Sequence, residues 1–345
     1  MAGRLTTEPA RTCYRVPPRN PADGIDWASD FGVRAIIFVD TEEEFDWSAP
    51  LSRHHRSTAA TSALPAAHRW FADHHYPLTF LVDHPIISDA RTVAILREIV
   101  AAGLSTIGAQ LHPWVTPPFD EAVAPANSFA GNLPRDLEAA KIDTMTALIE
   151  AAFGIRPRAY RAGRYGIGPN TLSLLAERGY RIDSSMRARY DYRRDDGPDF
   201  AAIDASPFWA DRTRQLIELP LTTIFTGKLR AIGPRLYRTA GIMPGGLGVL
   251  ARTRLLSRVA LTPEGMPVAD VLEALRTAVG QGVRLLNFSF HSPSLVPGCT
   301  PYVRDARDLV AFWQWWDAVL AELHRLNVMP IGLDALIAAA DATRG

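Results

Sequence analysis

Short apolar runs alternate with helical stretches along the chain from about residue 33 onward. Nearly continuous apolar runs of this length are typical of strands in a parallel sheet that is buried on both faces. The predicted strands are residues 34–39, 78–82, 105–111, 158–162, 180–183, 216–219, 285–290 and 328–331.

Four of the intervening stretches carry clear helical signals. Residues 134–153 and 169–178 each begin at a proline and end beside a glycine, which is the usual asymmetry of helix ends. Residues 89–102 and 304–326 carry apolar side chains at a spacing that places them on one helical face. About eight alternations of strand and helix predict a distorted (β/α) barrel of seven to eight parallel strands, with a doubly wound open sheet as the alternative.

The alternation of strands and helices also predicts the domain organisation of the chain. Residues 1–30 are rich in proline, arginine and glycine, which predicts an irregular arm lying over the domain. Residues 31–345 are expected to form one barrel domain. Within it, residues 187–265 are charged and glycine-rich and break the alternation, so they are expected to form an insertion on one face of the barrel.

Composition and charge exclude several classes of protein. The 37 basic residues balance the 37 acidic ones, and no basic cluster interleaved with aromatic residues is present, so a nucleic-acid partner is not expected. Cys13 and Cys299 are too few for a disulfide framework. The first residues lack the apolar core of a signal peptide and no segment has the length of a transmembrane helix, so a cytoplasmic protein is expected. Assembly into a homo-oligomer stays open.

Polar side chains collect where the predicted strands end, which is where barrel enzymes build their sites. Asp40 and Glu42 are two residues apart at a strand end, so both can face one pocket. Glu42 and His112 would form part of a metal site of carboxylate and imidazole type. His291 lies on the strand expected beside the first one, where it could act as a general acid. The full set is Asp40, Glu42, Asp83, His84, Gln110, His112, Trp114, Arg161, Arg164, Tyr165, Asp183, Ser184 and His291.

In their order along the chain, these segments resemble the motifs of the NodB-like polysaccharide deacetylases, carbohydrate esterase family four, and in particular a divergent bacterial branch. The resemblance covers roughly residues 33 to 337. The segments that carry it are VDTEEEFDW, PLTFLVDHP, IGAQLHPWVTPP, YRAGRYG, IDSSM and FSFHSP. It implies a barrel of the NodB-homology type.

The resemblance also implies a reaction, which is the metal-dependent hydrolysis of an N-acetyl or other N-acyl group on an amino sugar or glycan precursor. It implies Asp40 as the catalytic base, Arg161 as the partner of that base and His291 as the catalytic acid. Glu42 and His112 are the implied ligands of a divalent metal, with zinc expected first and nickel, cobalt or manganese as alternatives. Substrate contacts are expected from Trp47, Asp83, Gln110, Trp114, Arg164, Tyr165 and Asp183.

One feature departs from the family pattern. The second motif of the family supplies two histidines four residues apart, whereas positions 108 and 116 on either side of His112 are Gly108 and Thr116. Gln110, Asp83 or His84 are therefore the candidates to complete the metal site.

The other acids that follow the first strand are not expected to be catalytic. Glu43, Glu44 and Asp46 are predicted to belong to a solvated or structural loop, because charge runs are usually exposed. Two alternatives to a sugar deacetylase stay open. One is an amidohydrolase or deformylase acting on a small N-acyl compound, and the other is a sugar-binding protein that has lost its metal. A base and an acid on opposite sides of the pocket, as expected for Asp40 and His291, argue against the second.

Overall fold

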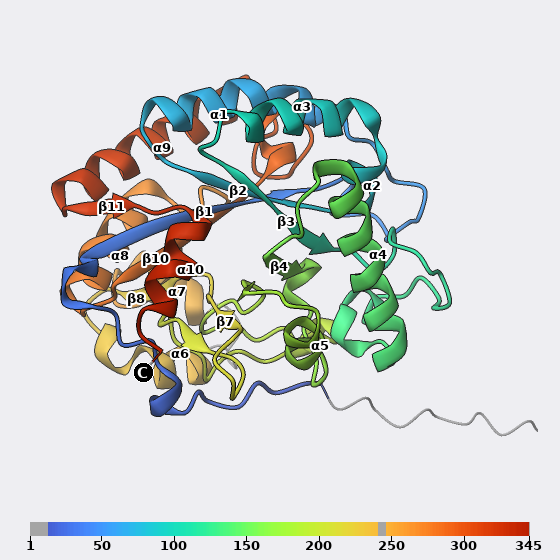
Figure 1. Ribbon diagram of the computed structural model, residues 1–345. Coiled ribbons are helices and arrows are strands. Elements are labelled where there is room, and N and C mark those ends of the chain that lie inside the picture. The colour runs from blue at the N-terminus through green and yellow to red at the C-terminus, as the bar shows by residue number, and fades with distance from the viewer. Residues whose placement is uncertain (1–12, 241–245, 345) are drawn as a thin grey trace, which may run out of the picture.

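A curled, mostly parallel sheet forms the body of the protein (Figure 1). The computed structural model describes residues 13–240 and 246–344. The sheet runs in the order β10-β1-β2-β3-β4-β5-β7-β6, with β11 added beside β1, and only β6 pairs antiparallel to its neighbour. Its strands are β1 (Val33–Thr41), β2 (Leu78–Val82), β3 (Thr106–Leu111), β4 (Ala159–Ala162), β5 (Ile182–Asp183), β6 (Phe208–Trp209), β7 (Ile217–Glu218), β10 (Leu285–His291) and β11 (Val328–Pro330). Every predicted strand is present, and the predicted distorted barrel is confirmed.

The strand that runs beside β1 is β10 and not the last strand of the chain. β10 pairs with β1 along its whole length, with Asp40 opposite His291. β11 pairs only with the first three residues of β1, so it extends the rim. Among the described residues no strand ladder joins β7 to β10. Instead, the Asn287 amide nitrogen donates to Leu219 O at 2.9 Å and to Ser184 Oγ at 3.0 Å, and Thr222 N donates to Asn287 O at 3.3 Å, so hydrogen bonds outside any ladder bridge the seam.

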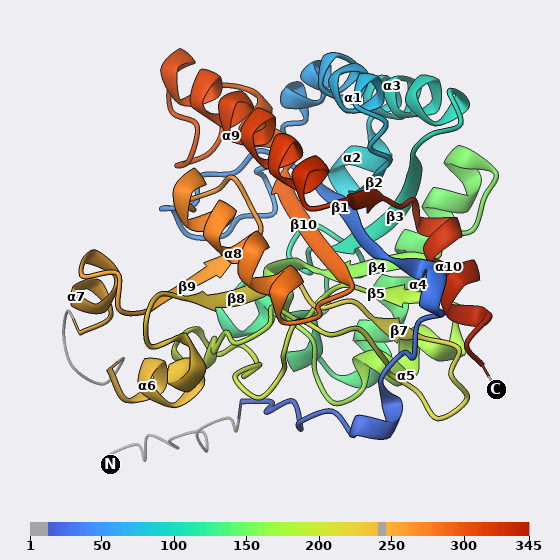
Figure 2. The ribbon, with the colours of Figure 1, turned by 90° about the vertical axis from the view of Figure 1, so that its left-hand side faces the viewer.

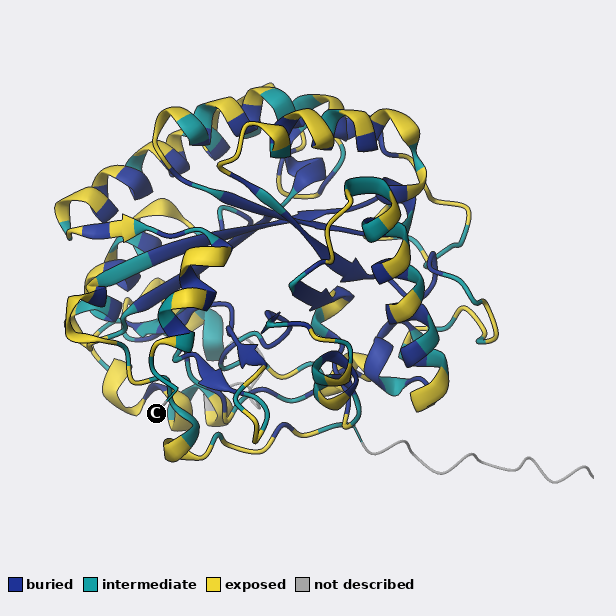
Figure 3. Cartoon of the chain, in the orientation of Figure 1, coloured by how far each residue is buried: buried dark blue, intermediate teal, exposed yellow. Residues whose placement is uncertain are grey.

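Helices cover the outer face of the sheet. Figure 1 shows α1, α3 and α9 side by side over one part of it, and Figure 3 shows the buried residues on the strands and on the helix faces turned toward them. On α9, Phe312 and Trp316 pack edge-on against Phe290 of β10, as the helical spacing predicts. The covering helices are α1 (Leu64–Asp73), α2 (His84–Ser88), α3 (Ala90–Ala101), α4 (Arg135–Phe153), α5 (Thr171–Glu177), α8 (Val268–Gly280) and α9 (Ala306–Arg325). α10 (Leu333–Asp341) packs instead with Ile36, Phe38 and Leu81, which point to the inner face of the sheet.

The predicted helices correspond to α3, α4, α5 and α9, and the other four carried no clear signal in the sequence. None of the helices in the described part of the chain combines the length and the apolar run that a membrane crossing requires. A cytoplasmic location and the oligomeric state stay predictions.

The stretch expected to be an insertion is built into the barrel at one end. Residues 187–265 contain β6 and β7 of the main sheet, and then a two-stranded antiparallel sheet of β8 (Thr223–Thr226) and β9 (Ser257–Ala260). Figure 2 shows this small sheet projecting to one side together with α6 (Gly233–Ala240) and α7 (Gly246–Arg252). The limits of the arm and of the insertion stay predictions, and residues 1–12 of the arm lie outside the described residues.

Candidate active site

A cavity of about 530 Å³ opens at the carboxyl ends of β1, β3, β4 and β10. Parallel strands end at the same edge of a sheet, so side chains from distant parts of the sequence meet there. Most of the predicted site residues line this cavity: Asp40, Glu42, Trp47, Gln110, His112, Arg161, Arg164, Tyr165 and His291.

Asp40 is held by the arginine that the resemblance assigns to it. The Arg161 Nη1 donates to Asp40 Oδ1 and also to Ser289 Oγ, the latter at 2.6 Å. The other two guanidinium nitrogens donate to Ser184, with Nε 2.8 Å from its carbonyl oxygen and Nη2 2.9 Å from its hydroxyl. Both charged side chains are nearly fully buried. The guanidinium is therefore fixed on all sides, and it fixes the direction of the carboxylate.

His291 lies directly beside Asp40. Its Nε2 is 3.6 Å from Asp40 Oδ2, and its Nδ1 is 2.6 Å from Glu264 Oε2. Burial by itself lowers the pKa of an imidazole, but the carboxylates of Glu264 and Glu42 outweigh it and raise the pKa of His291 to about 10. The ring is thus protonated at neutral pH and can donate from Nε2.

The expected placement of the base and the acid on opposite sides of the pocket is wrong. Residues 40 and 291 are register partners on neighbouring parallel strands, so their side chains start next to each other. The two side chains form a neighbouring pair at one wall of the cavity.

The imidazole of His112 lies between two consecutive glutamates. Glu42 Oε2 is 3.5 Å from Nε2 on the cavity side, and Glu43 Oε2 is 2.8 Å from Nδ1 on the far side. Successive side chains of a strand point to opposite faces, and these two residues follow directly on β1. One residue step therefore decides which of the two carboxylates reaches the cavity.

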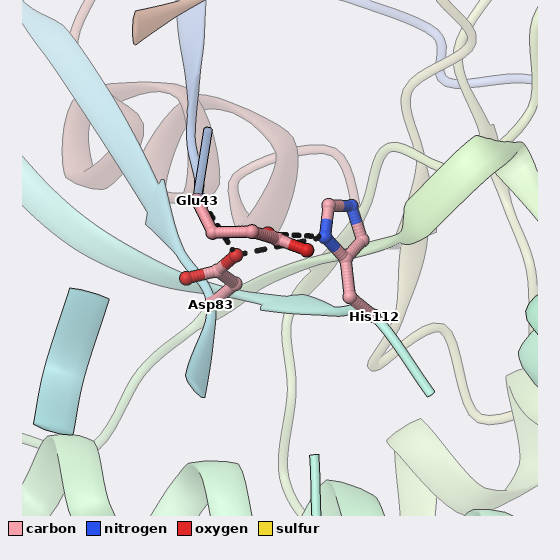
Figure 4. A group of neighbouring side chains, drawn as sticks. All are labelled: Glu43, Asp83 and His112. Carbon is pink, nitrogen blue, oxygen red and sulfur yellow. Dashed lines mark hydrogen bonds and ion pairs between the residues drawn. The ribbon is translucent and has the colours of Figure 1, made fainter. Parts of the chain in front are cut away.

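Of the two alternatives predicted for Glu43, a solvated or a structural residue, the solvated one is wrong, because its side chain is fully buried. Glu43, Asp83 and His112 form a buried group whose ligand atoms lie within 4.8 Å of one another, and such a group can hold a metal ion (Figure 4). Burial raises the pKa of Glu43 to about 8, and burial followed by the charge of Glu43 raises that of Asp83. Glu44 is half-buried and accepts from Ser57 Oγ at 2.8 Å, which is a structural role as predicted.

Three residues expected to contact substrate lie behind the cavity wall. The Trp114 ring stacks on His112 at 4.4 Å, and its indole nitrogen donates to Glu43. Asp83 caps α2 through Ile86 N and is fully buried. Asp183 is also fully buried and accepts from Ser185 Oγ. These three side chains do not line the cavity, and their contact with a substrate stays a prediction.

A glycine allows His112 to take its place. A Cβ built on Gly163 would lie 2.1 Å from His112 Cδ2, so any larger residue would displace the ring. The next two residues, Arg164 and Tyr165, have φ values of 56° and 60°, in the left-handed region that non-glycine residues rarely adopt. This tight turn brings both side chains to the cavity.

Comparison with solved structures identifies proteins that have a similar fold. No family model matches the sequence, and no curated protein matches it. A protein from Mycobacterium smegmatis assigned as a polysaccharide deacetylase aligns with a TM-score of 0.57 and 16% identity over 94% of this chain and 96% of that one. The chain has the fold of the polysaccharide deacetylases.

Two further structures agree with that fold. The allantoinase Puue aligns with a TM-score of 0.52 and 16% identity, over 94% of this chain and 99% of that one. A protein from Parabacteroides distasonis assigned as a glycoside hydrolase or deacetylase aligns with a TM-score of 0.55 and 11% identity, over 92% and 73% of the two chains. The resemblance seen in the motifs is thereby confirmed in the fold.

The cavity side of His112 suits a divalent cation. Glu42 Oε1 and Gln110 Oε1 are buried and make no hydrogen bond. Burial raises the pKa of Glu42 to about 7, because the charges of His291 and His112 only partly offset the desolvation of its carboxylate. The Gln110 amide is 2.9 Å from Glu42 Oε2 and 3.3 Å from His112 Nε2. A carboxylate, an imidazole and an amide around one point form a donor set that borderline divalent metals accept.

Two site residues were missed by the sequence reasoning. Glu264 lies in the loop after β9, inside the stretch taken for an insertion, and the strand-like run before it was the available signal. Glu43 was assigned to a solvated run, although its place next to a predicted ligand in a strand alternation could have identified it as the residue behind the site.

Proposed function

We propose that this protein is a metal-dependent hydrolase that removes an N-acetyl or other N-acyl group from an amino sugar or glycan precursor. The observation that carries the proposal is the Asp40–His291 pair at the cavity wall, each member of which is fixed by a buried ion pair, with Arg161 and with Glu264. A protein that only binds sugar has no need of two oppositely charged proton carriers held in this way.

The chain's own residues divide the work of hydrolysis. Asp40 takes a proton from the attacking water as its oxygen bonds to the acyl carbon. His291 donates the Nε2 proton to the leaving nitrogen as the C–N bond breaks, which releases a free amine and a carboxylic acid. Because Nε2 is 3.6 Å from Asp40 Oδ2, the proton held by Asp40 can return to His291 and reset the pair.

A divalent ion held by Glu42 and His112, with Gln110 as the third candidate, would polarise the acyl carbonyl and favour ionisation of water. Glu43 would act from behind, since its hydrogen bond to Nδ1 of His112 leaves Nε2 free to face the cavity. Zinc is the proposed ion, and nickel, cobalt and manganese are the alternatives.

An aromatic wall offers a surface for a sugar ring. Trp47 lies at the mouth with 37% of its surface exposed, and its ring meets His291 edge-on at 5.0 Å. Tyr302 continues this wall, 5.7 Å from Trp47. An apolar sugar face can stack there while its N-acyl group reaches Asp40 and His291.

Metal analysis combined with acetate release from N-acetylated sugars tests the proposal. The purified protein should bind one divalent ion and release acetate. Asp40→Asn and His291→Ala should each lower kcat by about 10²- to 10⁴-fold. Asp46→Asn, at the exposed mouth of the same cavity, is the matched control and should retain most activity.

No bound metal and no acetate release with added zinc, nickel, cobalt or manganese would overturn the proposal. Release of acyl groups only from small non-sugar amides would favour an amidohydrolase or deformylase. Sugar binding without any release would favour a binding protein.

A further inference from the structure

A second charged wall of the cavity has no role in the hydrolytic steps. Arg187 lines the cavity, and its guanidinium makes no ion pair with a carboxylate within the described residues. Its polar contact is a long one of 3.4 Å to the Tyr192 hydroxyl, and its Nε is buried without a hydrogen-bond partner. The cation is held instead by aromatic faces, 4.0 Å from the Tyr190 centroid and 5.5 Å from that of Tyr165.

A second arginine stands on the same wall. Arg164 lines the cavity beside Tyr165, donates to Ser128 Oγ and lies 4.3 Å from the centroid of the Phe129 ring. It also forms no ion pair in the described part of the chain. Asp195 is the one acid that lines this wall, and it comes within 4.0 Å of neither guanidinium.

The acids on the opposite wall already have partners. Asp40 is paired with Arg161, Glu264 with His291, and Glu42 with the Gln110 amide and the metal position. The cavity is therefore polarised, with acids that already have partners at one wall and, at the other, two guanidinium groups that form no ion pair with a described carboxylate. Tyr165 is close enough to both Arg187 and Asp40 for their charges to act on the pKa of its hydroxyl.

We infer that the substrate carries a negatively charged group, a carboxylate or a phosphate, that binds to Arg187 and Arg164 while its N-acyl group faces Asp40 and His291. The inference rests on the proposed function and names the substrate class for the same site. A desolvated guanidinium without a counter-ion is costly, and an oxyanion on the ligand compensates it. The planar fork of arginine also matches carboxylate and phosphate oxygens in pairs of hydrogen bonds.

Three N-acetylated monosaccharides separate the possibilities, because they share the amide and differ in charge. N-acetylglucosamine is neutral, its 6-phosphate carries a phosphate and N-acetylmuramic acid carries a carboxylate. At least one anionic sugar should have a kcat/KM for acetate release ten or more times that of the neutral sugar, and the better one identifies the anion. In Arg187→Gln the ratio of anionic to neutral kcat/KM should fall about 30-fold or more.

Matched variants exclude general charge effects and misfolding. Arg194→Gln makes the same charge change at an exposed residue that does not line the cavity, and it should keep the ratio within about twofold. Arg187→Lys keeps the charge and should keep part of the preference. Arg164→Gln tests the same wall at an exposed side chain if Arg187→Gln does not fold.

Binding measurements on Asp40→Asn distinguish failure of this inference from failure of the proposed function. If the anionic sugars bind more tightly than the neutral one but the wild type releases no acetate, the inference stands and the hydrolase proposal fails. If the wild type hydrolyses all three equally, or Arg187→Gln leaves the ratio unchanged, the inference is wrong and the hydrolase proposal stands. No release and no preference in binding would overturn both.

Discussion

Glu264 is expected to set the pH range over which His291 can act as an acid. Its Oε2 lies 2.6 Å from Nδ1 of His291, and its Oε1 accepts from the His291 backbone nitrogen at 2.9 Å. In Glu264→Gln the size of the side chain is kept and the charge is lost. A hydrogen bond to a charged group contributes about 1.5–3 kcal/mol, and 1.36 kcal/mol corresponds to one pKa unit, so the pKa of His291 should fall by about one to two units.

The direction of the expected shift in the pH–rate profile follows from the proposed role of the His291 ring as an acid. His291 must be protonated to donate, and with a pKa of about 10 it is protonated across the neutral range. Raising the pH through that value removes the acid and produces the alkaline limb of the rate profile. In Glu264→Gln this limb should move to lower pH by the same one to two units, while the acidic limb should stay in place. The fold of the variant should also lose the stabilisation that the raised pKa provides in the wild type, in full below about pH 6.5 and by less as the pH rises toward 10.

Two measurements check this expectation. The first is the pH dependence of kcat/KM for acetate release, and the second is the NMR titration of the His291 ring in the metal-free protein. Glu322→Gln on α9 is the control, because that glutamate is also buried and ion-paired but lies away from the cavity. An alkaline limb and a ring titration that stay at the wild-type pH in Glu264→Gln would refute the reasoning.

Three further variants test other parts of the site and fold. Glu43→Ala should weaken metal binding about 10- to 100-fold by titration calorimetry, because it removes the hydrogen bond that orients His112 from behind, while Glu44→Ala should leave it unchanged; equal affinities would show that Glu43 does not support the ligand. Gly163→Ala should displace His112 and weaken metal binding by a similar factor, whereas Gly280→Ala, where a Cβ meets nothing within 4 Å, should be neutral, and full affinity in the first variant would contradict the contact. Glu218→Gln should raise the melting temperature by about 2 °C or more at pH 8 and have little effect at pH 4. Burial raises the pKa of Glu218 well above its ordinary value, so above about pH 4.5 this residue ionises more readily in the unfolded chain, which favours unfolding of the wild type. A difference in melting temperature that does not depend on pH would exclude this cause.

The strands and the cavity edge could be predicted from the sequence because they depend on local pattern. Buried parallel strands are apolar along their length, so each run and its polar end are visible without knowledge of the neighbours. Asp40, Gln110, Arg161 and His291 were found in this way, since parallel order alone brings their strand ends together.

The face on which a strand-end side chain lies could not be predicted, because it depends on how the sheet curls. Trp114 and Asp183 sit at the correct edge but behind the wall, and Glu43 is buried by contacts with His112, which is 69 positions away. Glu264 was missed for a related reason, since its segment has a charged, irregular composition and becomes part of the site only through its bonds to His291.

The pairing of β1 with β10 joins two distant parts of the chain. β1 is among the first strands of the chain and β10 is nearly the last, so this contact has one of the largest sequence separations in the sheet. A chain synthesised as far as β7 already carries the proposed base, its arginine and the proposed metal ligands, but it lacks the proposed acid and leaves one edge of β1 unpaired. Under the proposed function, hydrolysis requires that β10 has covered that edge, so acetate release in a refolding experiment would report completion of the barrel and not merely its collapse.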